Sequence, residues 1–275
     1  MADVNAGSMA DPEALKRVVA RVEDLAADYE PPTFDQVPHP DAALFLAAID
    51  HQTGYTEAHL VDGEGPYDGS ALLWALGLRA ERRAPGALTA RSLLGVPAEA
   101  IAAVFRAGQD TLHDPERRAK LWDDLAKGML KDYAGRAETL IEASDGRLAG
   151  QGGVLFRLSS FDAFADPLRK KAFLLAKIWE RRGWLTVSDP ENWEVSSDNV
   201  LMRLALRSGL VEEGEVEEVR EATRDAFKQV AEQAGISPPV LDDLLWERGR
   251  ENPDLLGDEA GDLIEPPRRE GVVFY

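Results

Sequence analysis

The chain contains no cysteine in its 275 residues. This absence excludes disulfide bonds, thiolate metal ligands and cysteine nucleophiles. Long apolar runs are missing as well, and the first residues, MADVNAGSMADPEALKRV, lack the basic and apolar regions of a secretory signal. We therefore expect no membrane partner and a cytoplasmic location.

Several motifs that carry well-defined chemistry are also absent. The sequence has no GxGxxG after a strand, no GxxxxGK(S/T), no HExxH and no GxSxG. Its four histidines, His39, His51, His59 and His113, form no i, i+4 pair that would suit a metal ion. The acidic stretch DGEGPYDGS lacks the spacing of a calcium loop. We therefore expect neither a metal ion nor a cofactor.

Lysine is scarce, with 8 lysines against 23 arginines, and 50 acidic residues give a net charge of −19. Such a charge ordinarily repels nucleic acid. In a high-salt cytoplasm a negative surface is common to most proteins, and the charge would then say little about the partners of this one. The charge weakens a DNA hypothesis without removing it.

Strand signals are few, whereas helical periodicity is common, so the sequence predicts an all-α protein of roughly ten helices. The segment DAALFLAAID, if helical, carries apolar residues on nearly all sides of the helix, which predicts a buried helix. The expected helices cover about residues 12–29, 41–50, 88–106 (two helices with a Gly-Val-Pro turn), 114–143, 166–182, 198–208, 214–234 and 238–250.

The domain organisation follows from the same patterns. We expect residues 1–30 to form a lead and one helix, and residues 31–250 to form one helical domain with possible subdomains at 31–150 and 151–250. We expect residues 251–275 to form an acidic tail whose apolar end docks on the rest of the protein. The Gly- and Asp-rich loop at 51–70 is long enough to be functional.

The stretch DPLRKKAFLLAKIW places Lys170 beside an apolar helix face that includes Phe173, Leu174 and Ile178. A lysine desolvated by such a face has a lowered pKa and can act as an amine nucleophile. The alternative is an ordinary solvated charge, and the spacing alone favours that alternative.

In SSDNVLMRLALRSGLV, Asp198 precedes an apolar helix that stops at Gly209 and Leu210. As an N-cap, Asp198 would bind the free amides of the first turn and contribute about 1 kcal/mol. The same amides suit an ionised carboxylate that acts where positive charge develops on a sugar. The segment alone favours the capping role, and the two roles are compatible.

In GISPPVLDDLLWERG, Asp242 and Trp246 are four residues apart and share a helix face. Trp246 could stack on a flat base while Asp242 accepts hydrogen bonds from a guanine-type edge. Without further input, a core tryptophan and a first-turn charge are the simpler interpretation.

Taken together, the segments KKAFLLAKIW, SSDNVLMRLALRSGLV and GISPPVLDDLLWERG resemble the archaeal 8-oxoguanine DNA glycosylase family, a branch of the helix-hairpin-helix glycosylase superfamily. The resemblance covers about Pro167 to Arg250. A second resemblance, to the queuosine salvage family of nucleotide N-glycosidases, extends over more of the chain, through LFLAAID, YDGSALLWAL, AIAAVFR and SSDNVLMRL.

Both resemblances imply an all-α glycosylase-like fold with a pocket between two helical subdomains. They imply that Asp198 stabilises the oxocarbenium-like sugar, that Lys170 attacks C1′ in the DNA enzymes, and that Asp242 and Trp246 recognise the base. Phe173 or Leu174 occupies the place of a stacking aromatic in the DNA family.

The sequence departs from both families at Asn199, where a tyrosine is common, and this leaves the substrate open. By position, Asp50, His51 and Gln52 are further candidate contacts to the base.

The function predicted in this way is an N-glycosidase for a guanine-type base. A DNA glycosylase/lyase acting on oxidised guanine in base excision repair is slightly favoured. The alternatives are a queuosine-type nucleotide N-glycosidase in queuine salvage and a non-catalytic helical interaction module. The expected substrate is DNA or a modified nucleotide or nucleoside, and the sequence does not predict an oligomeric state.

Overall fold

The computed structural model describes residues 11–60, 63–258 and 260–262. Within these ranges it contains twelve α-helices, two short 3₁₀ helices and a two-stranded hairpin, so the predicted all-α fold is confirmed. None of the helices in these ranges is long and apolar enough to cross a membrane. The expected lead before residue 11 and the docked end of the tail lie outside the described residues.

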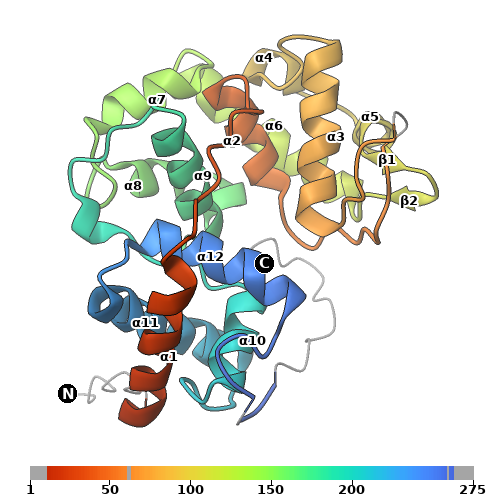
Figure 1. Cartoon of the computed structure of the whole chain (residues 1–275). Coiled ribbons are helices and arrows are strands. Elements are labelled where there is room, and N and C mark those ends of the chain that lie inside the picture. Colours follow the sequence, from red (N-terminus) through yellow and green to blue (C-terminus); the bar gives the residue numbers. More distant parts are fainter. Residues whose placement is uncertain (1–10, 61–62, 259, 263–275) are drawn as a thin grey trace. The chain divides into compact units, whose positions relative to one another are not determined.

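The described residues group into two compact units. The terminal unit joins residues 11–32 to residues 193–262, and the middle unit comprises residues 33–192 (Figure 1). The sequence predicted a separate first helix and a possible division after residue 150, which falls inside the middle unit. The difference arises because the first helix packs against a helix from the far end of the chain, and periodicity does not reveal such a partner.

The terminal unit is built from α1 (Pro12–Ala26), α10 (Asn199–Arg207), α11 (Val216–Ala234) and α12 (Pro238–Glu251). Both α1 and α10 pack against α11 and α12 around an apolar core. Where α12 meets α10, a Cβ on Gly249 would come within 2.7 Å of the Leu204 Cδ1 atom. A glycine at this position therefore permits the close approach of α10 and α12.

The middle unit contains the remaining helices and the hairpin. These are α2 (Pro40–Ile49), α3 (Gly69–Arg83), α4 (Ala90–Leu93), α5 (Ala98–Val104), α6 (Pro115–Asp132), α7 (Ala137–Ser144), α8 (Val154–Leu158) and α9 (Lys170–Arg181), the strands β1 (Arg106–Ala107) and β2 (Asp110–Thr111), and the 3₁₀ helices η1 (Asp162–Phe164) and η2 (Pro190–Asn192). The strands β1 and β2 pair antiparallel. The predicted pair of helices around the Gly-Val-Pro turn is present as α4 and α5.

Helix α2 lies at the centre of the middle unit. All of its residues from Pro40 to Ile49 are buried, as the apolar sequence predicted. It packs against α3, α6, α7 and α9, which supply the walls around it.

The amphipathic run at 114–143 forms two helices, α6 and α7. Ala134 and Gly135 both adopt positive φ angles, of 54° and 77°. The Gly135 amide donates to the carbonyl of Met129, which closes the end of α6. The sequence pattern continues across this turn because apolar residues lie on both sides of it, so periodicity alone did not show the break.

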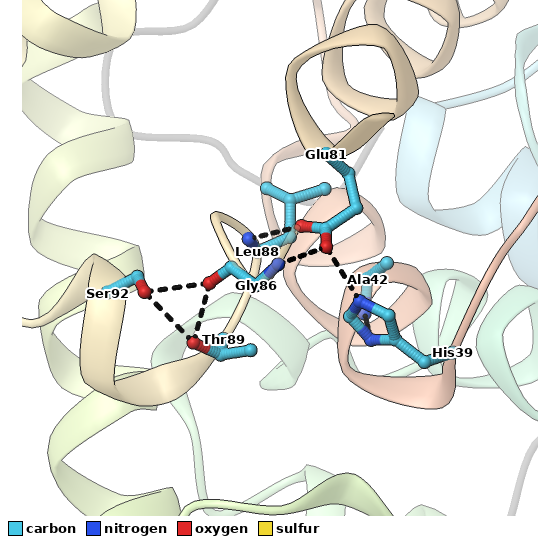
Figure 2. A network of polar contacts seen from close by, with 7 residues as sticks. All are labelled: His39, Ala42, Glu81, Gly86, Leu88, Thr89 and Ser92. Carbon is cyan, nitrogen blue, oxygen red and sulfur yellow. Dashed lines mark hydrogen bonds and ion pairs between the residues drawn. The ribbon is translucent and has the colours of Figure 1, made fainter. Parts of the chain in front are cut away.

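A polar network holds the start of α2 (Figure 2). His39 Nδ1 accepts a hydrogen bond of 3.1 Å from the Ala42 amide, so the ring proton is assigned to Nε2, which lies 3.1 Å from Glu81 Oε1. Glu81 also accepts from the amides of Gly86 (2.5 Å) and Leu88 (2.7 Å). One carboxylate thus ties the end of α3 and the following turn to the N-cap of α2.

The environment of Glu81 favours its ionised form. Burial alone would raise the pKa of the Glu81 carboxyl, but the amides of Gly86 and Leu88 and the ring of His39 outweigh burial and lower the pKa. The ionised carboxylate therefore stabilises the fold.

Replacing Glu81 by Gln should lower the free energy of unfolding by about 1–3 kcal/mol, because one side-chain oxygen cannot replace two carboxylate oxygens that accept three hydrogen bonds. Urea unfolding at neutral pH measures this, with the exposed Glu99→Gln as the control, expected within about 0.5 kcal/mol of wild type.

The same difference should depend on pH. Because the folded pKa of Glu81 lies below its usual 4.5, its contribution is complete above pH 4.5 and is lost as the pH falls through the lowered pKa. Equal stability of Glu81→Gln and wild type at neutral pH would contradict the role of this network.

Candidate active site

Asp198 stands immediately before α10 and caps it, as the sequence predicted. Its Oδ1 atom accepts hydrogen bonds from the amides of Val200 (2.9 Å) and Leu201 (3.0 Å). The residue is 8% exposed, and the positive end of the α10 dipole favours negative charge at this place. Both capping bonds end on Oδ1, so the cap does not use Oδ2.

The other end of α10 also follows the sequence pattern. Gly209 has a φ of 73°, and its amide donates to the carbonyl of Leu206. The amide of the buried Leu210 donates to the carbonyl of Ala205, which completes a Schellman motif. Helix α10 is therefore fixed at both ends by local signals.

Asp242 fixes the backbone that leads to Asp198. Asp242 lies in the first turns of α12, and its Oδ1 atom accepts a hydrogen bond of 2.8 Å from the Ser196 amide. Because α12 packs against α10, this bond joins the two helices through the segment before the cap. The sequence did not predict this positioning role, and recognition of a base by Asp242 stays a prediction.

Trp246 lies one turn after Asp242 on α12. Its half-buried side chain packs against the core of the terminal unit. The guanidinium of Arg250 lies 4.7 Å from the centre of the indole ring, in a cation–π contact. Arg250 covers one face of the ring, and stacking of a base on Trp246 stays a prediction.

Lys170 is the first residue of α9 and is half-buried. Its backbone amide donates to Asp166 Oδ2 at 3.1 Å, and the amide of Leu168 donates to Asp166 Oδ1 at the same distance. The buried Asp166 therefore fixes the turn that carries Lys170. The sequence interpretation did not single out Asp166.

The neighbouring Lys171 is the deeply buried lysine, with 1% of its surface exposed. Its Nζ atom donates to the carbonyl of Ala48 at 2.8 Å and lies 3.3 Å from His51 Nδ1. Ala48 belongs to the last turn of α2, where carbonyls lack a partner within the helix. Lys171 thus caps the C-terminus of α2.

Burial and neighbouring charges shape the pKa values of Lys171 and His51. Burial lowers the pKa of Lys171 well below its usual value. Burial, followed by the positive charges of Lys171 and Arg118, lowers the pKa of His51 far below its usual 6.5. A neutral His51 with its proton on Nε2 can accept from Lys171 at Nδ1.

The three candidates after α2 lie in the same unit as Lys170. Asp50 is buried, and its Oδ2 atom accepts hydrogen bonds from Ser70 Oγ (2.6 Å) and Trp74 Nε1 (2.9 Å). His51 is buried beside Lys171, and Gln52 is half-buried with a φ of 35°. Their contacts show how the end of α2 is held, and contact with a base stays a prediction.

Phe173, the candidate stacking aromatic, is buried on α9, whereas Leu174 is half-buried. Helix α9 packs against α2 and α8. The candidate residues therefore divide between the units: Asp198, Asp242 and Trp246 belong to the terminal unit, and Lys170, Phe173, Asp50, His51 and Gln52 belong to the middle unit. In the described part of the chain, no group of three or more His, Asp or Glu side chains is arranged to hold a metal ion.

The sequence held a signal that distinguishes the two lysines. Lys171 precedes the buried Leu175 by four residues and the buried Ile178 by seven, so it lies on their face of α9. Because α9 has buried residues on almost all sides, the sequence pattern alone does not show which face carries the buried lysine.

Comparison with solved structures identifies the fold. The chain is similar to endonuclease III in a trapped covalent intermediate with DNA, an estranged-adenine complex, with a TM-score of 0.53 and 14% identity over 88% of each chain. A non-covalent endonuclease III–DNA complex gives a TM-score of 0.51 and 13% identity over 86% of this chain and 85% of that one.

A third similar structure is the 8-oxoguanine DNA glycosylase from Pyrobaculum aerophilum complexed with 8-oxoguanosine. Its TM-score is 0.53, with 19% identity over 87% of this chain and 89% of that one. No family model and no curated protein matches the sequence. The predicted helix-hairpin-helix glycosylase fold is confirmed, and at these identities the likeness shows the fold alone.

The two adjacent lysines should differ in their effect on stability. Lys171→Ala should lower the free energy of unfolding by about 2–4 kcal/mol, because it leaves a cavity and an Ala48 carbonyl without its donor. Lys170→Ala, at the half-buried position, should cost less than about 1 kcal/mol. Denaturant unfolding of the two variants measures the difference, and equal losses would contradict the assigned cap.

Proposed function

We propose that the chain is an N-glycosidase that releases a guanine-type base from DNA, with oxidised guanine as the favoured substrate. The observation that carries this proposal is the carboxylate of Asp198, held at the start of α10 by two backbone amides. The glycosylase fold over most of the chain supports it. Three glycosylase-like structures in complex with DNA or 8-oxoguanosine make nucleic acid the natural class of substrate to test.

The proposed chemistry places positive charge near a fixed negative one. When the bond between C1′ and the base nitrogen breaks, its electron pair leaves with the base and the sugar becomes oxocarbenium-like. A carboxylate that is already oriented stabilises that charge without reorganisation. The amides on Oδ1 and the bond from Ser196 to Asp242 supply this orientation for Asp198.

In the lyase reaction, a lysine amine bonds to C1′ as the base departs and then loses a proton. The C1′–O4′ bond opens with its electron pair and that proton on O4′, which leaves a protonated Schiff base between the lysine and C1′. We propose Lys170 for this role, because Lys171 Nζ is already bound to the carbonyl of Ala48 and lies beside His51. Lys171 supports the end of α2 and thereby holds the neighbouring Lys170 in place on α9. Asp166, which binds the Lys170 amide, would orient the first turn of α9.

Recognition of the base is assigned to Trp246 and Asp242, with Phe173 and residues 50–52 as further contacts. Trp246 supplies a planar face, backed by Arg250 on its other side. The Asp242 carboxylate, which accepts from the Ser196 amide, is the group proposed to accept hydrogen bonds from a guanine-type edge.

The net charge of −19 favours a second candidate, a nucleotide N-glycosidase of the queuosine type. A free nucleotide requires neither a basic groove nor a lyase lysine. The same Asp198 would serve that reaction, because the charge that develops on the sugar is the same.

Asp198→Asn should reduce base release by about 10²–10³-fold, in the range seen when a group that stabilises transition-state charge is removed. Stability should change little, because asparagine caps helices about as well as aspartate. The assay follows release of 8-oxoguanine from a duplex oligonucleotide under single-turnover conditions.

The matched control for this variant is Asp11→Asn, which makes the same change at the cap of α1 in the same unit. It should leave base release unchanged. If Asp198→Asn released the base as fast as wild type, Asp198 would be a helix cap only. If the wild-type chain released no base from DNA or from a nucleotide, the chain would be an interaction module.

Borohydride should trap the chain on an oligonucleotide that carries one 8-oxoguanine, because the reagent reduces a Schiff base to a stable amine. Lys170→Gln should abolish the adduct, whereas Lys177→Gln, a change on the same helix, should retain it. Base release without any adduct would contradict the lyase step and move the assignment to a water-dependent glycosidase.

A further inference from the structure

A cavity of about 610 Å³ lies in the middle unit, beside the β1–β2 hairpin. Its walls come from α3, the end of α5, the hairpin and the segment around His59, and Figure 1 shows these helices and strands next to one another. The volume is within the range of sites that hold small ligands. Of the lining residues that the structure describes, none belongs to the candidate active site.

Three arginines and a histidine line this cavity, and they come from separate elements. Arg79 and Arg83 lie one turn apart on α3, Arg106 comes from β1, and His59 comes from the segment before α3. No aspartate or glutamate is among the described residues that line it, although the whole chain carries a net charge of −19. A guanidinium stays charged at neutral pH, so Arg83 and Arg106 bring two permanent positive charges to one cavity, which favours an anionic ligand there.

Two of the arginines are available to a ligand. Arg83 and Arg106 are exposed, and within the described ranges neither guanidinium group forms a hydrogen bond or an ion pair. Arg79 is buried deeper in the wall, at 9% exposure. A guanidinium presents a planar fork of donors that matches the oxygens of a phosphate group.

The remainder of the wall is apolar. Leu60, Leu76 and Val104 line it together with small alanines of α3, α5 and β1. Val104 is 44% exposed, so part of this wall is open to solvent. A cavity lined by both arginines and apolar side chains suits a ligand that joins an anionic group to a flat or apolar group.

We propose that this cavity binds the phosphate ester of a nucleotide, with the phosphate at Arg83 and Arg106 and the sugar or base against the apolar wall. The nucleotide could be free, or it could be part of a DNA strand. The second source rests on the proposed function, whereas the first does not. The cavity would hold a nucleotide apart from the one at Asp198.

The test measures binding of two probes to the full chain. Calorimetry with 5′-dGMP reports the free nucleotide, and fluorescence anisotropy with a labelled undamaged oligonucleotide reports the strand. Arg83→Glu and Arg106→Glu should each weaken binding by about tenfold or more, because each removes and reverses a charge that contacts phosphate. The matched control is Arg82→Glu, the same change at the adjacent exposed residue of α3, which does not line the cavity.

Each outcome decides between the sources or against the cavity. Sensitivity of dGMP binding to Arg83→Glu and Arg106→Glu supports a free nucleotide, and sensitivity of the oligonucleotide alone supports a strand. Equal losses with Arg82→Glu, or no binding of either probe, would overturn the proposal. Competition by inorganic phosphate as strong as that by dGMP would overturn the role of the apolar wall.

Failure of the proposed function would be distinguishable from failure of this inference. In an Asp198→Asn chain, Arg83→Glu and Arg106→Glu should weaken probe binding by the same factor as in the wild-type chain, because Asp198 is not among the described residues that line the cavity. Loss of base release with intact binding would therefore separate the two sites. Binding that persists in a chain without any glycosidase activity would support the cavity and contradict only the active site.

Discussion

The middle unit depends on one constraint: α2 is buried along its whole length, so its backbone ends must find partners inside the protein. The ring of His39 accepts a hydrogen bond from the Ala42 amide in the first turn, and Lys171 donates to the carbonyl of Ala48. Trp122 donates its indole N–H to the carbonyl of Phe45, at 2.7 Å. These partners come from α6, α9 and the segment before α2. Satisfying α2 therefore also commits Lys171 of α9 to a structural role.

The terminal unit shows how one carboxylate can serve both stability and chemistry. A cap orients Asp198 through its contacts with backbone amides, and these contacts exist before any substrate binds. The Ser196–Asp242 bond then ties the same segment to α12. A charge fixed in this way requires little rearrangement when a cationic sugar forms, which is the condition under which electrostatic stabilisation is effective. Stability and catalysis would thus be coupled through the geometry of one helix start.

Local signals predicted more of the structure than long-range ones did. The cap at Asp198 and the stop at Gly209 were predictable because each involves residues within a few positions of the helix end. The roles of Lys171 and Glu81 were not predictable from local signals. Lys171 binds Ala48, which lies 123 residues away in the sequence, and Glu81 binds His39, which lies 42 residues away. The break between α6 and α7 was missed for another reason, because apolar residues continue on both sides of it. Periodicity identifies a buried face but does not name what covers it.

The net charge of −19 limits association at a distance more than it limits contact. Between exposed charges, salt screens the interaction beyond about 10 Å at 0.1 M ionic strength, so a distant acidic surface adds little at a binding site in salt. Arginines that line a cavity act at hydrogen-bond distance, where screening is weak. An acidic chain can therefore recognise phosphate where Arg83 and Arg106 converge, but it lacks long-range attraction to a nucleic acid. For such a chain, the number of local phosphate contacts, rather than the overall charge, would set the salt dependence of binding.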